Sequence, residues 1–233
     1  PAVVYCYAPG RGGDQAEGFL DGVSGVLQVD GYAGYNRLAR PDRPDGPLRL
    51  AYCWAHARRK LHEIAKGRTA PIAEDGLRRI AEIYRIETAI RGRPAPERLA
   101  IRQVRSVPLV DAFGDWVEAQ RARTSPKSPL GEALRYIFKL WDGLNLFLED
   151  GRVEIDSNPV ERAIRPIALN RKNALFAGHD EGGRNWGVVA SLIETAKLND
   201  VDPQAYLAGT LSALVNGHKQ SCIDELMPWH VAA

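Results

Sequence analysis

The feature that most constrains the fold is a change in the hydrophobic pattern after Trp54. From there, apolar residues recur at helical spacing for about a hundred residues. Three stretches carry this spacing, at residues 72–91, 109–117 and 130–148. Proline-bearing segments at 91–96 and 124–129 separate the stretches and are the expected connections between helices. The pattern therefore predicts an all-helical segment over residues 54–150.

Short segments rich in β-forming residues lie on both sides of this helical segment. Strands are expected at residues 2–7, 26–30, 48–52 and 152–155. Residues 14–23 are expected to form a short helix between the first two strands. Strands interleaved with helical pieces favour a mixed α/β core, in a chain that is predominantly helical overall.

Composition is that of a globular chain and excludes several classes of protein. The 233 residues include 31 Lys and Arg against 29 Asp and Glu, so a nucleic-acid surface has to come from local clustering of positive charge. No run of eighteen apolar residues occurs, which argues against a membrane-spanning helix. The three cysteines are odd in number and far apart, as expected of a protein in a reducing cytoplasm.

Asp30 is the first candidate for a functional acid. It ends an expected strand and is followed by Gly31, and the carboxyl ends of strands are where α/β sheets place their ligand sites. Enzymes that act on phosphodiesters need such acids to hold divalent metals. The alternative is that Asp30 only begins an Asp-Gly turn, which is a common turn pair. Judged by this signal alone, the turn is the better interpretation.

Glu161 is the second candidate, at the expected start of a helix. Asn158 and Pro159 precede it in the order of a helix cap, so Glu161 also fits a capping box with no functional role. Basic side chains follow within a dozen positions: Arg162, Arg165, Arg171 and Lys172. An acid beside a cationic cluster suits a site for a metal and a phosphate, and the alternative is a solvated basic helix face.

Cys53 and His56 have half of the spacing of a zinc site. The second half is missing, because no further Cys-x-x-Cys or His-x-x-x-His pair follows, and structural zinc needs four ligands. The basic residues just after this pair are Arg58, Arg59 and Lys60. They are expected to form a positively charged helix face that could contact DNA.

Five longer stretches are more specific than these short motifs. They are LQVDGYAGYNRL (27–38), AYCWAHARRKLHEIA (51–65), IDSNPVERAIRPIALNRKNALFAG (155–178), SLIETAKLNDVDPQAYL (191–207) and IDELMPW (223–229). Together they resemble transposases of the insertion sequence 66 family, and the resemblance covers essentially the whole chain.

The resemblance implies a DDE-type transposase with a ribonuclease H-like catalytic core. In such enzymes three carboxylates bind two Mg²⁺ (or Mn²⁺) ions, and water and then a DNA 3′-hydroxyl attack phosphodiesters. By motif, Asp30 corresponds to the second acid and Glu161 to the third. Cys53 and His56 are similar to a Cys-x-x-His pair that some DDE enzymes carry, and are expected to support the site rather than bind zinc.

The resemblance also implies partners and an order of domains. Expected partners are double-stranded DNA of the transposon ends and target, further copies of the chain, and accessory proteins of the same element, at the bacterial nucleoid. The expected order is a first part of the core at 1–53, the helical insertion at 54–150, a second part of the core at 151–200 and a C-terminal helical element at 201–233.

One departure from the family pattern concerns the first acid. In the family it belongs to a strand upstream of a segment similar to PAVVYCYAPGRGG (1–13), so the first core strands and this acid are expected to be missing here. We therefore expect the isolated chain not to cut or join DNA. The alternative is a non-catalytic DNA-binding or oligomerisation remnant of a truncated transposase. A purely helical assembly domain is disfavoured by the basic stretches 56–68 and 162–172.

Overall fold

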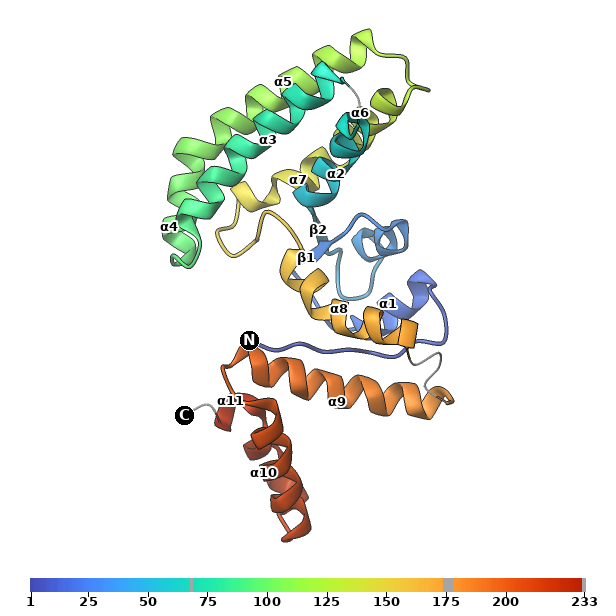
Figure 1. The fold of residues 1–233 in the computed structure, drawn as a ribbon, viewed down its shortest axis with the longest axis vertical. Helices are drawn as coiled ribbons and strands as arrows, with labels where there is room; N and C mark the ends of the chain where they lie inside the picture. Colours follow the sequence, from blue (N-terminus) through green and yellow to red (C-terminus); the bar gives the residue numbers. More distant parts are fainter. Residues whose placement is uncertain (68, 174–177, 232–233) are drawn as a thin grey trace. The chain divides into compact units, whose positions relative to one another are not determined.

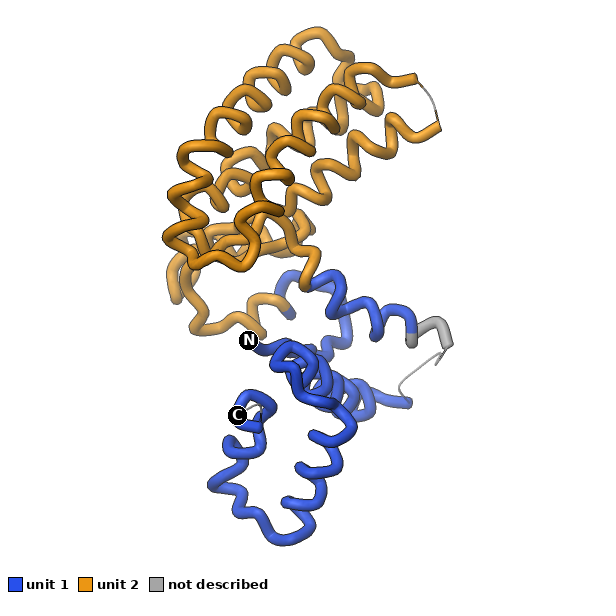
Figure 2. The backbone as a smooth tube through the Cα atoms, turned by 60° about the vertical axis from the view of Figure 1, so that its left-hand side comes forward, with its two compact units in different colours: residues 1–15, 160–233 blue, residues 16–159 orange. Residues whose placement is uncertain are grey.

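The computed structural model describes residues 1–67, 69–173 and 178–231, with the side chains of 170–173 excepted. It is predominantly helical and contains a two-stranded parallel sheet (Figure 1). The chain divides into two compact units, one of residues 16–159 and one of residues 1–15 with 160–233 (Figure 2). Within the described ranges, no helix has the length and apolar character needed to cross a membrane.

The unit of residues 16–159 contains both strands and most of the helices. A short helix, α1 (Gly13–Phe19), leads into it. The elements that follow are β1 (Val26–Val29), the 3₁₀ helix η1 (Ala33–Ala39), β2 (Arg49–Tyr52), α2 (Trp54–Ala65), α3 (Pro71–Ile90), α4 (Ala95–Ile101), the π-helical turn η2 (Arg102–Ser106), α5 (Val107–Arg123), α6 (Pro129–Lys139), α7 (Trp141–Asn145) and the 3₁₀ turn η3 (Leu146–Leu148). The three helical stretches expected from the hydrophobic spacing are thereby confirmed.

The sheet aligns the ends of its two strands. β1 and β2 run parallel, with Val26 opposite Arg49 and Val29 opposite Tyr52. The next residues along the chain, Asp30 and Cys53, therefore leave the sheet at the same edge. Because carboxyl ends of parallel strands meet at one edge, two of the predicted site residues are brought close by the register alone.

Residues 2–7 do not form the expected strand. They are extended and run along α9 (Asp180–Leu198) within the unit of residues 1–15 and 160–233 (Figure 1). The backbone N–H of Val3 donates to Thr195 Oγ1 at 3.0 Å, and that of Tyr5 donates to Ser191 Oγ at 2.8 Å. Hydroxyl groups on a helix thus satisfy main-chain groups that a strand would have paired with a neighbour, and the strand prediction was wrong.

Residues 152–155 were also wrongly predicted as a strand, since they form turns before α8 (Asn158–Asn173). Val153 and Ile155 are buried in the hydrophobic core of the unit of residues 16–159. The carbonyl of Ile155 accepts from the backbone N–H of Trp54 at 3.1 Å. The alternating apolar pattern therefore marks a loop anchored to the core, which a pattern of period two does not distinguish from a strand.

Trp54 lies at the centre of this core. It is fully buried, and its indole Nε1–H donates to the carbonyl of Leu144 at 2.8 Å. The rings of Phe113, Trp141 and Phe147 surround it, with centroids 5.7, 6.2 and 6.3 Å away. Because Trp54 is the first residue of α2, this aromatic packing fixes the point at which the chain passes from the sheet into the helices.

Arg102 is the most deeply buried charge in the described chain, with no exposed surface. Its guanidinium pairs with the Glu87 carboxylate of α3 through two hydrogen bonds, at 2.8 and 2.6 Å. A third nitrogen donates to the carbonyls of Phe147 and Val153, both at 2.9 Å. A paired and fully hydrogen-bonded arginine can stay charged in an apolar core, and here it holds the segment that leads to α8.

We expect Arg102→Met to destabilise the unit of residues 16–159 by about 3–5 kcal/mol, because Glu87 would be left buried without its partner. Arg105→Met in the same π-helical turn is the matched control, since Arg105 is exposed, and should change little. The double variant Arg102→Met, Glu87→Leu should recover part of the loss. Urea unfolding followed by tryptophan fluorescence measures all three, and equal losses for Arg102 and Arg105 would contradict the prediction.

The second unit is helical throughout its regular structure. It contains α8 beyond Pro159, α9, α10 (Pro203–Val215), the 3₁₀ helix η4 (Gln220–Leu226) and α11 (Pro228–Val231). Asp202 caps α10 by accepting from the backbone N–H of Ala205 at 2.7 Å. The buried Tyr206 donates its hydroxyl to the carbonyl of Leu226 at 3.0 Å, which ties the C-terminal turns to α10.

Candidate active site

Asp30 is exposed at the carboxyl end of β1 and forms a tight turn there. Its Oδ1 accepts a hydrogen bond from the backbone N–H of Tyr32 at 2.9 Å, and Gly31 has a positive φ of 88°. The turn role considered from the sequence is therefore real. The turn uses Oδ1 of an exposed residue, so it does not exclude a functional role.

Tyr136 of α6 lies against this turn and was not identified from the sequence. The Tyr136 hydroxyl approaches the carbonyl of Asp30 at 3.5 Å. A Cβ added at Gly31 would lie 2.9 Å from the hydroxyl oxygen of Tyr136. Burial raises the pKa of Tyr136, and the nearby Cys53 and Asp30 raise it further. The helical region thus contributes a side chain to the edge of the sheet at which Asp30 lies.

Cys53 connects the start of α2 to the segment that precedes α8. Its buried Sγ accepts from the backbone N–H of Ser157 at 3.3 Å. Asn158, the expected helix cap, donates its backbone N–H and its side-chain amide to the Asp156 carboxylate, at 3.1 and 2.7 Å. The first residues of α8 are therefore fixed by contacts within residues 16–159.

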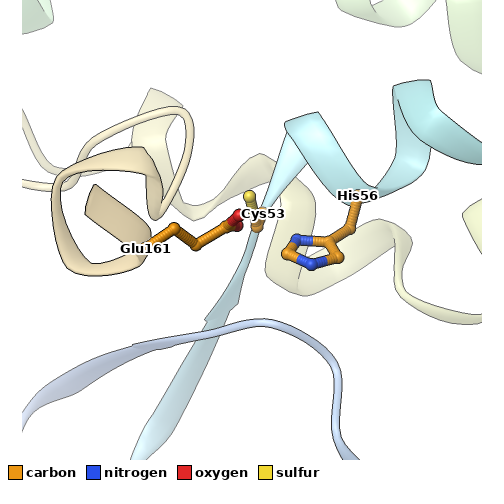
Figure 3. A group of neighbouring side chains, drawn as sticks. All are labelled: Cys53, His56 and Glu161. Atoms are coloured by element: carbon orange, nitrogen blue, oxygen red, sulfur yellow. The ribbon is translucent and has the colours of Figure 1, made fainter. Parts of the chain in front are cut away.

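Figure 3 draws three further side chains, of which Cys53 and His56 belong to the unit of residues 16–159 and Glu161 to the other unit. Cys53 precedes α2, His56 lies in its first turn, and Glu161 lies in the first turn of α8. Glu161 follows Asn158 by less than one helical turn, so its position depends on the anchored start of α8. A metal ion shared by Asp30 and Glu161 stays a prediction.

The ligand atoms of the candidate residues indicate which metal ions each residue could bind. Mg²⁺ prefers oxygen ligands, which the carboxylates of Asp30 and Glu161 supply. Thiolate and imidazole ligands suit softer cations, so Cys53 and His56 do not fit Mg²⁺. The expectation that this pair supports the site without binding metal also stays a prediction.

A second tyrosine missed by the sequence analysis, Tyr84, lies near Asp156 and Cys53. Tyr84 of α3 is largely buried, and burial raises the pKa of its phenol, with further contributions from the carboxylate of Asp156 and from Cys53. The neutral phenol of Tyr84 therefore lies beside Asp156, the residue that accepts hydrogen bonds from Asn158 at the start of α8. Nothing local marks Tyr84 in the sequence, since it is one of several large residues in a helical stripe.

The basic residues expected to bind DNA are exposed where the structure describes them. Arg58, Arg59 and Lys60 project from α2, and the Lys60 ammonium lies 5.4 Å from the centre of the Tyr136 ring. Arg162 and Arg165 are exposed on α8. The side chains of Arg171 and Lys172 lie outside the described residues. The charged face of α2 thus begins at Arg58, just after His56.

Comparison with known proteins identifies the family. Residues 1–185 match the family model described as "Transposase IS66 family", and residues 191–229 match the "IS66 C-terminal element". The chain belongs to the IS66 transposase family. Two uncharacterized proteins of Sinorhizobium fredii, y4qI and y4jD, are each 42% identical to it over 233 residues, or 99% of this chain. No solved structure gives a significant match.

The IS66 chain spans less than half of the curated relatives that it matches. The matched region is 43% of y4qI and 46% of y4jD. A third S. fredii protein, the uncharacterized y4hP, is 39% identical over 241 residues, or 98% of this chain and 44% of its own length. Family membership indicates a transposase-related function.

Because Gly31 lies close to Tyr136, we expect Gly31→Ala to lower the free energy of unfolding more than Gly46→Ala does. Both glycines have a positive φ, 88° and 78°, so alanine should cost about 1–2 kcal/mol at either position. A Cβ at Gly46 meets nothing within 4 Å, whereas at Gly31 it meets the Tyr136 hydroxyl.

Urea unfolding of Gly31→Ala and Gly46→Ala measures this difference in the free energy of unfolding. In a Tyr136→Phe background the difference should shrink, because the opposing oxygen is gone. Equal costs in the wild-type background would show that the turn does not pack against α6.

Proposed function

We propose that this IS66 chain is the catalytic-domain portion of a DNA transposase that hydrolyses phosphodiesters and transfers strands at the ends of its element. The observation that carries the proposal is family membership over residues 1–185 and 191–229, with two motif acids present in the chain. Asp30 follows a parallel strand, and Glu161 lies in the first turn of a helix whose start is anchored to the end of the neighbouring strand.

The chemistry requires acids that hold divalent metal and cations that hold phosphate. Asp30 and Glu161 would hold Mg²⁺ or Mn²⁺, and in a two-metal site the ions stabilise the attacking and leaving oxygens of the phosphodiester. Arg162 and Arg165, on the same helix as Glu161, would bind the DNA backbone beside the reacting phosphate. Arg58, Arg59 and Lys60 would extend this DNA surface along α2, and Arg171 and Lys172 along α8.

The proposal includes a ribonuclease H-like core interrupted by a helical insertion. It is supported by the order of elements: an acid-ended parallel strand, a second strand, a long helical region and then a helix that carries the last acid. Residues 1–53 and 151–200 would form the two parts of this core, with 54–150 inserted and 201–233 as a C-terminal element.

The alternative is a non-catalytic remnant that binds DNA or oligomerises. It is supported by the exposed basic residues Arg58, Arg59, Arg162 and Arg165, which could bind DNA without catalysis. Assembly with further copies of the chain and with accessory proteins of the same element is compatible with either function, as is a place at the bacterial nucleoid.

The catalytic proposal is tested by strand transfer on supercoiled DNA that carries the element's ends, with Mg²⁺ or Mn²⁺. In a full-length transposase containing these residues, Asp30→Asn and Glu161→Gln should each lower product formation by about 10²-fold or more, because misplacing the reacting groups is that costly. The exposed Asp111→Asn, on α5, is the matched control.

The same assay separates the catalytic proposal from the remnant alternative. Activity that survives both acid substitutions would contradict the assigned roles of Asp30 and Glu161. The 233 residues alone should give no joined product, since they carry two of three acids, and efficient joining by them would show that the third acid is not required.

DNA binding is the second test. Replacing Arg58, Arg59, Arg162 and Arg165 with alanine should weaken binding and flatten its dependence on salt, with the slope falling by about 0.9 for each phosphate that the variant no longer neutralises. The control removes four other exposed arginines, Arg85, Arg91, Arg105 and Arg123, and the same amount of charge. Fluorescence anisotropy at several salt concentrations gives both slopes, and identical slopes would remove the proposed DNA surface.

A further inference from the structure

We propose that the groove between α2 and α6 binds those phosphates of the DNA strand that neighbour the reacting one. The two helices pack against each other (Figure 1), and the groove between them has a volume of about 620 Å³. Its charged and aromatic lining residues are Lys60, Glu63, Glu132, Arg135, Tyr136 and Lys139. All of them belong to the unit of residues 16–159. This role depends on the proposed catalytic function, which brings the reacting phosphate to Asp30.

The directions of the two helices place one end of the α2–α6 groove at Asp30. α2 begins directly after Cys53, which leaves the sheet at the same edge as Asp30. α6 runs toward this edge, because Tyr136 in its last turn approaches the Asp30 carbonyl at 3.5 Å. Leu140, just beyond α6, would lie 3.4 Å from a Cβ added at Gly31. The start of α2 and the end of α6 therefore both lie at the edge of the sheet that carries Asp30.

The charges of the α2–α6 groove are separated along its length. On α2, Lys60 lies about one turn nearer to the sheet than Glu63 does. On α6, Arg135 and Lys139 lie about one and two turns nearer to it than Glu132 does. The cations therefore gather toward the sheet, and the acids lie toward the far end of the groove.

The three cations are open to a ligand. Lys60, Arg135 and Lys139 are exposed, and within the described residues none of them forms an ion pair. The Lys60 ammonium lies 5.4 Å from the centre of the Tyr136 ring. A cation–π contact of this kind orients an ammonium without neutralising its charge. Because the Tyr136 hydroxyl approaches the Asp30 carbonyl, this contact also holds a positive charge near the candidate acid.

A DNA backbone is the ligand whose charge matches this distribution. A strand whose reacting phosphate lies at Asp30 has its next phosphates beside the same edge of the sheet. Arginine and lysine side chains bind such phosphates and release the counterions that surround DNA. Glu63 and Glu132 would repel phosphates farther along, so the groove holds a short length of one strand. Holding the neighbours of the reacting phosphate fixes its orientation for attack.

The 233-residue chain carrying Arg135→Ala and Lys139→Ala tests the α2–α6 groove. Its DNA binding should weaken, and the slope of log K against log salt should fall by about 0.9 for each phosphate that is no longer neutralised. The matched control is Arg85→Ala with Arg105→Ala, which removes two exposed arginines of α3 and η2 and the same charge. Fluorescence anisotropy with a labelled duplex of element-end sequence, at several salt concentrations, measures both double variants. Equal slopes for the two would overturn the proposal, as would absence of DNA binding by the wild-type chain.

Photo-crosslinking locates the DNA without relying on a loss of charge. A photoreactive amino acid in place of Lys139 should join to the labelled duplex, and the same amino acid in place of Arg105 should not. Both positions are exposed, and circular dichroism checks that both substituted chains fold. Crosslinking through position 105 and not through position 139 would place the DNA elsewhere and overturn the groove.

Failure of the groove is distinguishable from failure of the proposed catalytic function. Asp30→Asn is expected to lower strand transfer in a full-length transposase, but it should still crosslink through position 139, because the groove is lined by α2 and α6. Strand transfer that survives Asp30→Asn, together with crosslinking through position 139, would contradict the catalytic role of Asp30 and leave the groove in place. Strand transfer lost in Asp30→Asn, without crosslinking through position 139, would contradict the groove alone.

Discussion

The buried ion pair of Arg102 and Glu87 is the constraint on which the rest of the site depends. Arg102 joins α3 to the carbonyls of Phe147 and Val153, and so fixes the segment that returns from the helical region. That segment then contacts the start of α2 through Ile155 and Ser157. Asn158 follows directly, so a charge in the core fixes the point at which α8 begins.

The regular elements of residues 16–159 were predictable because local pattern decides them. Period and proline placement located α3, α5 and α6, and the two β-rich runs of the sheet were also found. Residues 2–7 and 152–155 were not, because β-forming composition says nothing about the partner. In residues 2–7 the backbone donates to hydroxyl groups of α9. In residues 152–155 the apolar side chains are buried in the core although the backbone forms turns.

The candidate site was predictable only where the family motif supplies it. Asp30 and Glu161 come from motif stretches, and the register of β1 and β2 agrees with the expected edge for Asp30. Tyr136 and its approach to Asp30 were missed. They depend on contacts between residues about a hundred positions apart, which no spacing rule along a single sequence can reveal.

Arg102 binds the segment that returns from the helical region through the main-chain carbonyls of Phe147 and Val153, not through their side chains. Carbonyl oxygens are the same in every residue, so mutation of the side chains there leaves these acceptors in place. The hydrogen bonds to Arg102 would therefore survive a substitution at an exposed position of that segment such as Arg152, whereas Phe147 and Val153 are also held by burial in the core.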